Sequence, residues 1–147
     1  GASASVQKSS PFDHRIKKIQ EHGLDSMFDE LNERWYAPNF VAHNLDVVNA
    51  VRKMVNATAK TGYIAATMAV RNFDIVDKLS EIETEILLIT GAEDKATPIA
   101  EAKFIAAKCT NCKLLVIKNA SHLAIVEQPE LFDTAIVNFI KKVPLPT

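Results

Sequence analysis

Two polar residues, Asp94 and His122, each follow an apolar run of the chain by a few residues. The run ILLI at 86–89 precedes Asp94, and the run LLVI at 114–117 precedes His122. A carboxylate that accepts a hydrogen bond from one imidazole nitrogen fixes the tautomer of the ring and leaves the other nitrogen free to act as a base. The pair would supply two thirds of a catalytic triad. The alternatives are a turn-forming aspartate and a helix-capping or surface histidine.

The two apolar runs predict a pair of parallel β-strands. Each run is continuous rather than alternating, which is typical of a strand covered by helices on both faces. The stretch PIAEAKFIAAK at 98–108 supplies a helix between the strands, so the unit is β-α-β and right-handed. A last helix is expected over about 130–142, with Leu131, Ala135 and Phe139 on one face.

The expected sheet places the two candidate residues together but is incomplete. Neighbouring strands lie about 4.8 Å apart, and functional loops gather at the carboxyl ends of parallel strands. We therefore expect Asp94 and His122 within hydrogen-bond reach. Two strands that are apolar on both faces leave two unpaired edges, where each unpaired buried backbone group costs about 1–3 kcal/mol. Other strands from a missing N-terminal portion or a partner chain would pair these edges; unusual cover by helices is the alternative.

The first half of the sequence predicts helices. Ser10 caps a helix that Gly23 ends, and a second helix from Leu24 ends before Pro38. Further helices are expected over about 43–58, 62–70 and 74–80. The third helix has five apolar residues expected to face inward: Val47, Val48, Val51, Met54 and Val55.

These elements divide the chain into four segments. They are an N-terminal loop or expression scar (1–9), a helical part (10–82), a β-α-β-α part (83–143) and a tail (144–147) with Pro144 and Pro146.

Composition excludes several classes of function. Of the 147 residues, 48% are hydrophobic and 24% charged, and 17 basic against 18 acidic side chains give a net charge of −1. We expect no binding to nucleic acid, because no basic run is long enough. We expect no membrane span, because no apolar run approaches the roughly 20 residues required. The first residues do not resemble a signal peptide, and the sparse cysteines favour a reducing, cytoplasmic location.

Cys109 and Cys112 form a single C-x-x-C motif. A structural zinc site needs four ligands, and a second pair is missing. We expect two reduced bystanders, with a local disulfide as the alternative. A redox role is disfavoured because the motif lacks the usual strand-to-helix placement. We expect no metal and no other cofactor.

The segments LLITGAEDKATP and LLVIKNASHLAIVEQPELFDTAIVNFI resemble the C-terminal third of the α/β-hydrolase fold. There, strand-G-x-x-D-x-x-[TV]-P carries the triad acid and [AS]-x-H-x-x-x-x-E-x-P-E carries the base. The resemblance implies that Asp94 is the acid, that His122 is the general base and that the helices over 10–82 form a cap. ERWYAPNF at 33–40 and GYIAATMAVRNFD at 62–74 are similar to the 3-oxoadipate enol-lactonase branch.

This narrower similarity implies that Trp35 lines the substrate pocket; a core position against Phe28 and Leu31 is the alternative. The polar residues Arg34, Arg71 and Asn72 hint at an acidic group on the substrate.

The chain departs from the family at the nucleophile. The family needs G-x-S-x-G on a strand-to-helix turn, and this sequence has none. In GASAS, Ser5 occupies the position of the second glycine, so Ser3 is a poor candidate.

We therefore expect the C-terminal fragment of a serine hydrolase acting on a small-molecule ester or lactone. It would be inactive alone and would be completed by a missing N-terminal part or a second chain. A further expected partner is a second copy of the same chain, in a homo-oligomer. The alternative is a non-catalytic binding or assembly module derived from an α/β-hydrolase.

Overall fold

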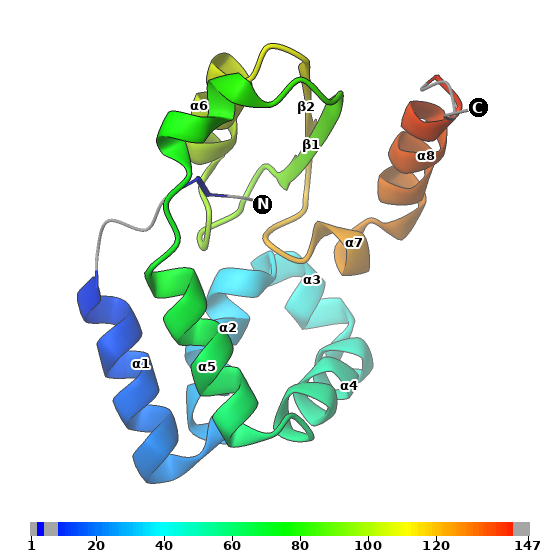
Figure 1. The fold of residues 1–147 in the computed structure, drawn as a ribbon. Helices are drawn as coiled ribbons and strands as arrows, with labels where there is room; N and C mark the ends of the chain where they lie inside the picture. Colours follow the sequence, from blue (N-terminus) through cyan, green and yellow to red (C-terminus); the bar gives the residue numbers. More distant parts are fainter. Residues whose placement is uncertain (1–2, 5–8, 143–147) are drawn as a thin grey trace.

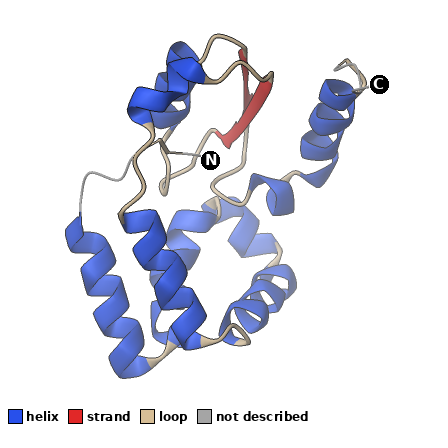
Figure 2. Cartoon of the chain, viewed as in Figure 1, coloured by secondary structure: helices blue, strands red, loops and turns tan. Residues whose placement is uncertain are grey.

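The computed structural model describes residues 3–4 and 9–142, with side chains for all of these except Ser9 and Ser10. Helices form most of the chain, and two short strands lie next to each other (Figure 2). Helices α1 to α5, which we refer to as the cap after the predicted segment, precede a C-terminal part that holds both strands (Figure 1). The predicted N-terminal loop lies largely outside the described residues, and the predicted tail lies wholly outside them.

The cap begins with two helices that reverse direction at Gly23, whose φ of 79° favours glycine. The expected second helix starts as a 3-10 turn and continues as α2, which ends before Pro38 as predicted. The elements of the cap are α1 (Ser9–His22), η1 (Leu24–Met27), α2 (Phe28–Trp35), α3 (Pro38–His43), α4 (Leu45–Asn56) and α5 (Lys60–Arg71).

Helix α3 is not predicted by the sequence pattern. The pattern indicates Pro38 only as the residue that ends a helix, but its fixed φ also suits the first position of the next helix, and it occupies that position here. The prediction that Met54 faces inward is wrong: this side chain is 67% exposed, and Val48 is the only buried residue of α4. Helix α4 lies at the periphery of the cap, so only a narrow stripe is covered (Figure 1).

The C-terminal part contains the predicted β-α-β unit. Strands β1 (Ile86–Gly91) and β2 (Cys112–Ile117) pair in parallel, with Leu88 opposite Leu114. Helix α6 (Ile99–Lys108) connects them. A 3-10 helix, η2 (Val76–Glu81), precedes β1, and two helices follow β2: α7 (Ala124–Glu127) and α8 (Pro129–Ile140).

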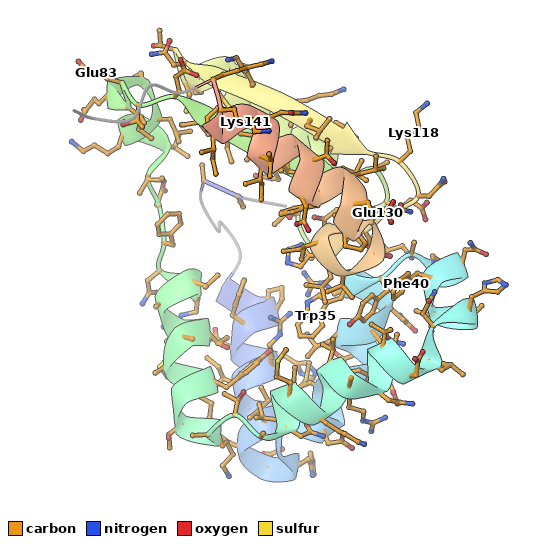
Figure 3. All side chains as sticks on the ribbon, turned by 90° about the vertical axis from the view of Figure 1, so that its right-hand side faces the viewer. Trp35, Phe40, Glu83, Lys118, Glu130 and Lys141 are labelled. Atoms are coloured by element: carbon orange, nitrogen blue, oxygen red, sulfur yellow. The ribbon has the colours of Figure 1, made fainter. Side chains whose placement is uncertain are left out.

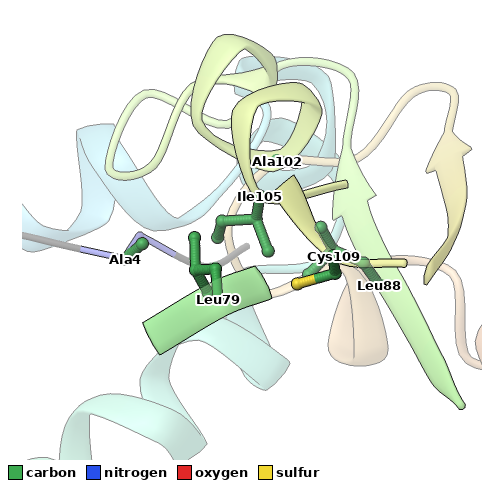
Figure 4. Packing of buried hydrophobic residues seen from close by; sticks show 6 residues of the cluster. All are labelled: Ala4, Leu79, Leu88, Ala102, Ile105 and Cys109. Atoms are coloured by element: carbon green, nitrogen blue, oxygen red, sulfur yellow. The ribbon is translucent and has the colours of Figure 1, made fainter. Parts of the chain in front are cut away.

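Apolar side chains pack on both faces of the sheet, as the continuous apolar runs predict. On one face, Leu88 packs with residues of α6 and η2 (Figure 4); this cluster comprises Ala4, Leu79, Leu88, Ala102, Ile105 and Cys109. On the other face, Ile89 and Leu115 pack against Ile117, Ala120 and Ala124, together with Phe132 of α8. The sheet is thus covered by apolar side chains on both faces. This packing holds the two strands, and therefore their carboxyl ends, in place.

Two features leave this cover incomplete. Within the described residues the sheet has two strands, so each strand has an outer edge that no other described strand pairs. No residue of α8 is buried, and Leu131, which shares a predicted face with Ala135 and Phe139, is 56% exposed. Sheet edges and apolar helix faces of this kind are typical of surfaces that another part of a fold covers.

The two cysteines are free thiols: Cys109 follows the last residue of α6, and Cys112 is the first residue of β2. Cys109 is buried and Cys112 is half-buried. Burial, together with the neighbouring Cys109, raises the pKa of the Cys112 thiol, which makes it less reactive than an exposed cysteine. No described helix is long and apolar enough to cross a membrane.

Candidate active site

Asp94 lies in a tight turn that follows β1. The backbone N–H groups of Ala96 and Thr97 both donate to its Oδ1 at 2.8 Å, and the Thr97 hydroxyl donates to Oδ2 at 2.9 Å. Its side chain has no solvent exposure. An aspartate that accepts backbone donors two and three residues ahead forms an Asx-type turn, so the loop fixes the direction of the carboxylate.

His122 lies in the loop that follows β2 (residues 118–123, here the His122 loop). Its Nδ1 is 3.0 Å from Oδ2 of Asp94 and 3.3 Å from Oγ1 of Thr97. The imidazole is 27% exposed. The structure thus brings the two predicted residues together, and it directs Nδ1 to the carboxylate. A proton on Nδ1 leaves Nε2 as the basic nitrogen of the ring.

Asp94 is held in its charged form. Burial raises the pKa of this carboxyl, but hydrogen bonds from the Thr97 backbone, His122 and the Thr97 hydroxyl outweigh burial, and the pKa falls below its ordinary value. A charged Asp94 both orients the imidazole and stabilises the imidazolium that forms when His122 accepts a proton.

The His122 loop lies directly against the end of β1. A Cβ placed on Gly91 would lie 2.1 Å from the carbonyl oxygen of Ser121 and 2.4 Å from that of Ala120. The Glu93 N–H donates to the Ala120 carbonyl at 2.9 Å. Only glycine permits this close backbone approach. The approach fixes the position of the His122 loop, and so of His122, relative to Asp94.

The cap holds the His122 loop from the other side. The hydroxyl of Ser121 shares its hydrogen bond between the Arg34 carbonyl at 3.2 Å and the Glu93 carbonyl at 3.1 Å, and the Leu123 N–H donates to the Trp35 carbonyl at 3.0 Å. The residues on both sides of His122 are therefore bonded to the end of α2. The position of the imidazole depends on the cap as well as on the sheet.

Glu127 joins the same two parts with a buried carboxylate. Its Oε1 accepts the Ala37 N–H at 2.6 Å, and its Oε2 accepts the Ser121 N–H. Burial raises the pKa of Glu127; the two backbone donors oppose that shift, and the charges of Glu93 and Asp94 add to it. The buried Tyr36 lies close by: burial and the Glu127 charge raise its pKa to about 12.

Sequence reasoning missed the positioning roles of Glu127, Gly91 and Thr97. The signal for Glu127 was present, because H-x-x-x-x-E is part of the resemblance, but spacing alone does not show that the carboxylate bonds to Ala37 on the cap. In the sequence pattern, Thr97 appeared only as the threonine before Pro98 in the [TV]-P that follows the triad acid. Its hydroxyl contacts both the carboxylate and the imidazole.

Trp35 lies where the cap meets the C-terminal part (Figure 3). It is half-buried and packs on two apolar clusters, one formed around Leu31 and one around Phe28. These packing contacts are the ones that the core alternative expects, and they leave part of the ring exposed. The role of Trp35 in a substrate pocket stays a prediction.

Ser3, the weak candidate for a nucleophile, donates a hydrogen bond from its hydroxyl to Glu101 at 3.0 Å. Its neighbour Ala4 is buried against η2 and α6. Among the residues that the structure describes, no group of three or more His, Cys, Asp or Glu side chains is arranged to hold a metal ion.

Known proteins resemble this chain in sequence and in fold. The family model described as TAP-like protein, an α/β-hydrolase model, matches residues 51–147. The 3-oxoadipate enol-lactonase 2 of Acinetobacter baylyi is 26% identical over 139 residues, which are 95% of this chain and 52% of that protein. A hydrolase from Pseudomonas aeruginosa PA01 is 29% identical with a TM-score of 0.87, covering 94% of this chain and 52% of that one.

The fold match is closer still for the enol-lactonase from Burkholderia xenovorans LB400, with a TM-score of 0.91 at 21% identity over 95% of this chain and 54% of that one. The chain spans about half the length of the relatives it matches. It belongs to the TAP-like protein family of α/β-hydrolases and has the C-terminal half of that fold, with helices and two parallel strands.

Proposed function

We propose that this chain supplies the acid and the base of a serine hydrolase that cleaves an ester or a lactone. The observation that carries the proposal is the 3.0 Å contact between Oδ2 of Asp94 and Nδ1 of His122, at the carboxyl ends of two parallel strands. Supporting it, relatives named as enol-lactonases align with nearly the whole chain.

In the proposed reaction, Nε2 of His122 takes the proton of a serine hydroxyl as that oxygen attacks the carbonyl carbon of the substrate. Asp94 stabilises the imidazolium. The imidazolium then protonates the leaving alkoxide oxygen, and the C–O bond breaks to leave an acyl-serine. Water attacks the acyl group, again losing its proton to His122, and the serine is regenerated.

The nucleophile and the oxyanion donors lie, in this proposal, in residues other than these 147. The sequence contains no G-x-S-x-G, the turn on which the family carries its serine. An N-terminal part of the same protein or a second chain would provide it. The chain alone is therefore expected to be inactive, and Trp35 would form one wall of the completed pocket.

Fluorophosphonate labelling tests the proposal in the completed protein, in which this chain is joined to the N-terminal part or second chain that carries G-x-S-x-G. The probe should label one serine, and His122→Ala should slow labelling and ester turnover by a factor of about 10⁴ or more. His43→Ala is the matched control, because His43 is exposed and, among the described residues, its ring hydrogen-bonds within α3, to the Asn39 carbonyl. Equal labelling of the His122→Ala protein would contradict the proposal.

The alternative, a binding or assembly module, is supported by the exposed apolar side chains Leu131, Val137 and Ile140 on α8. An evolved module should be monodisperse and inert toward esters in every context. A hydrolase portion should self-associate when isolated and gain ester turnover when completed. Sedimentation velocity and an ester assay on the same samples distinguish the two.

A further inference from the structure

The hydroxyl of Thr97 lies against both residues of the candidate catalytic pair. It donates to Oδ2 of Asp94 at 2.9 Å, and its oxygen is 3.3 Å from Nδ1 of His122. Oδ2 and Nδ1 are themselves 3.0 Å apart. The three atoms thus form a closed triangle, each side of which is short enough for a direct polar contact.

The local sequence holds this hydroxyl in place. Thr97 is β-branched, which restricts its χ1 angle, and it precedes Pro98, which favours an extended backbone at Thr97. The Thr97 backbone N–H donates to Oδ1 of Asp94 at 2.8 Å, so the main chain attaches this residue to the carboxylate as well. Helix α6 begins directly after Pro98. The turn therefore sets the position of the hydroxyl.

The hydroxyl has one hydrogen, and Asp94 accepts it. A threonine hydroxyl donates once and accepts through two lone pairs. The carboxylate oxygen is charged and nearer than the imidazole, so Oγ1 of Thr97 faces Nδ1 of His122 with a lone pair. An unprotonated Nδ1 would face this lone pair and the charge of Oδ2, whereas a protonated Nδ1 donates to both. The hydroxyl thus favours the same tautomer of His122 that Asp94 favours.

The hydroxyl also acts on the carboxylate. Burial raises the pKa of Asp94, and hydrogen bonds from the Thr97 backbone, His122 and the Thr97 hydroxyl bring the pKa below its ordinary value. A donor on Oδ2 draws negative charge from the oxygen that also accepts the Nδ1 hydrogen, so it weakens Oδ2 as an acceptor for His122. The charge of Asp94 is also felt by Glu127, a buried carboxylate that the variants below leave intact.

We propose that Thr97 is a positioning residue of the catalytic pair: its hydroxyl keeps a proton on Nδ1 of His122 and limits how strongly Asp94 holds that proton. The hydrogen-bond geometry stands on its own contacts, whereas its consequence for turnover rests on the proposed hydrolase function. In that reaction the imidazolium must give a proton from Nε2 to the leaving oxygen, and too strong a hold by Asp94 would oppose this transfer.

Thr97→Val tests the hydroxyl alone, because valine has nearly the same shape and keeps the backbone N–H that donates to Asp94. In the 147-residue chain, ¹³C NMR follows the titration of the Asp94 carboxyl, and ¹H–¹⁵N NMR follows the Nδ1 proton of His122. The variant should raise the pKa of Asp94 and move the Nδ1 proton resonance to higher frequency, because Oδ2 becomes the stronger acceptor and no longer shares this proton. Thr97→Ser retains a hydroxyl and should restore both signals.

Thr67→Val is the matched control. Thr67 is buried, and its hydroxyl donates to the Tyr63 carbonyl at 2.8 Å within α5. This variant should leave both NMR signals unchanged. Thr97→Ala also lacks the hydroxyl and should shift both signals as valine does, so the test does not depend on one variant being folded. Unshifted signals in the two variants without the hydroxyl, or equal shifts in Thr67→Val, would refute the role of Thr97.

Turnover of the completed protein provides a second readout. Thr97→Val should lower kcat about tenfold and leave KM within about twofold, because the hydroxyl acts on the base rather than on substrate binding. The NMR measurement needs no nucleophile, so it separates this proposal from the hydrolase proposal. Shifted NMR signals without ester turnover would refute only the hydrolase proposal. Turnover with unshifted signals would refute only the role of Thr97.

Discussion

Replacing Gly91 by alanine tests whether the close approach of β1 to the His122 loop positions the active site. The new Cβ would lie 2.1 Å from the Ser121 carbonyl oxygen and 2.4 Å from that of Ala120, where real contacts are at least 3.0 Å. Both oxygens belong to the backbone, so no side chain can rotate away. The His122 loop must therefore move by about an ångström relative to Asp94, which lies three residues beyond Gly91.

The expected cost follows from this contact. Overpacking that forces a backbone shift destabilises by about 1–3 kcal/mol, and we expect Gly91→Ala to reach the upper end. A displacement of about 1 Å at a catalytic group also lowers the rate about 10²-fold. Urea unfolding of the chain measures the first effect, and ester turnover of the completed protein measures the second.

Gly62→Ala is the control for Gly91→Ala. Gly62 lies in α5, and a Cβ added there would have no neighbouring atom within 4 Å, so the same substitution should stabilise the chain by about 0.5–1 kcal/mol. The two variants should thus shift the urea midpoint in opposite directions. An unchanged midpoint for Gly91→Ala would refute the close-approach reasoning.

Two further predictions concern the buried carboxylates. Glu127→Gln should destabilise the chain by about 2–3 kcal/mol in urea unfolding, because the NH2 group that replaces one carboxylate oxygen cannot accept the backbone N–H of Ala37 or Ser121 that faces it; a loss below about 0.5 kcal/mol would contradict the bridging role. Because the pKa of Asp94 is lowered on folding, its contribution is fully present above the pKa of an unfolded aspartate and is lost as pH falls through the folded pKa. The stability advantage of the natural chain over Asp94→Asn should therefore shrink as the pH falls below about 4; a difference that does not change between pH 5 and pH 3 would be inconsistent with it.

The pairing of Asp94 with His122 could be predicted because it depends on few assumptions. Continuous apolar runs identify covered parallel strands, and the carboxyl ends of neighbouring parallel strands lie side by side. Each residue follows its strand within a short loop, so little freedom remains between them. The 3.0 Å contact and the register of β1 with β2 agree with this reasoning.

The groups that position this pair could not be predicted in the same way. Glu127 and Gly91 act through neighbours that are distant in sequence or specific to backbone packing, and periodicity does not report these. The exposure of Met54 and Leu131 has a related cause, because an apolar stripe predicts which side of a helix is apolar but not whether another element covers it. Helices α3 and α7 were missed because each is too short for a period to appear.

The most direct test of the account is the protonation of the two ring nitrogens of His122, measured by ¹⁵N NMR on the 147-residue chain at neutral pH. If Asp94 holds the ring as the structure places it, the proton resides on Nδ1 and Nε2 is unprotonated, and Asp94→Asn weakens this preference. A neutral ring with its proton mainly on Nε2, or a tautomer that does not respond to Asp94→Asn, would contradict the assignment of His122 as a base oriented by Asp94.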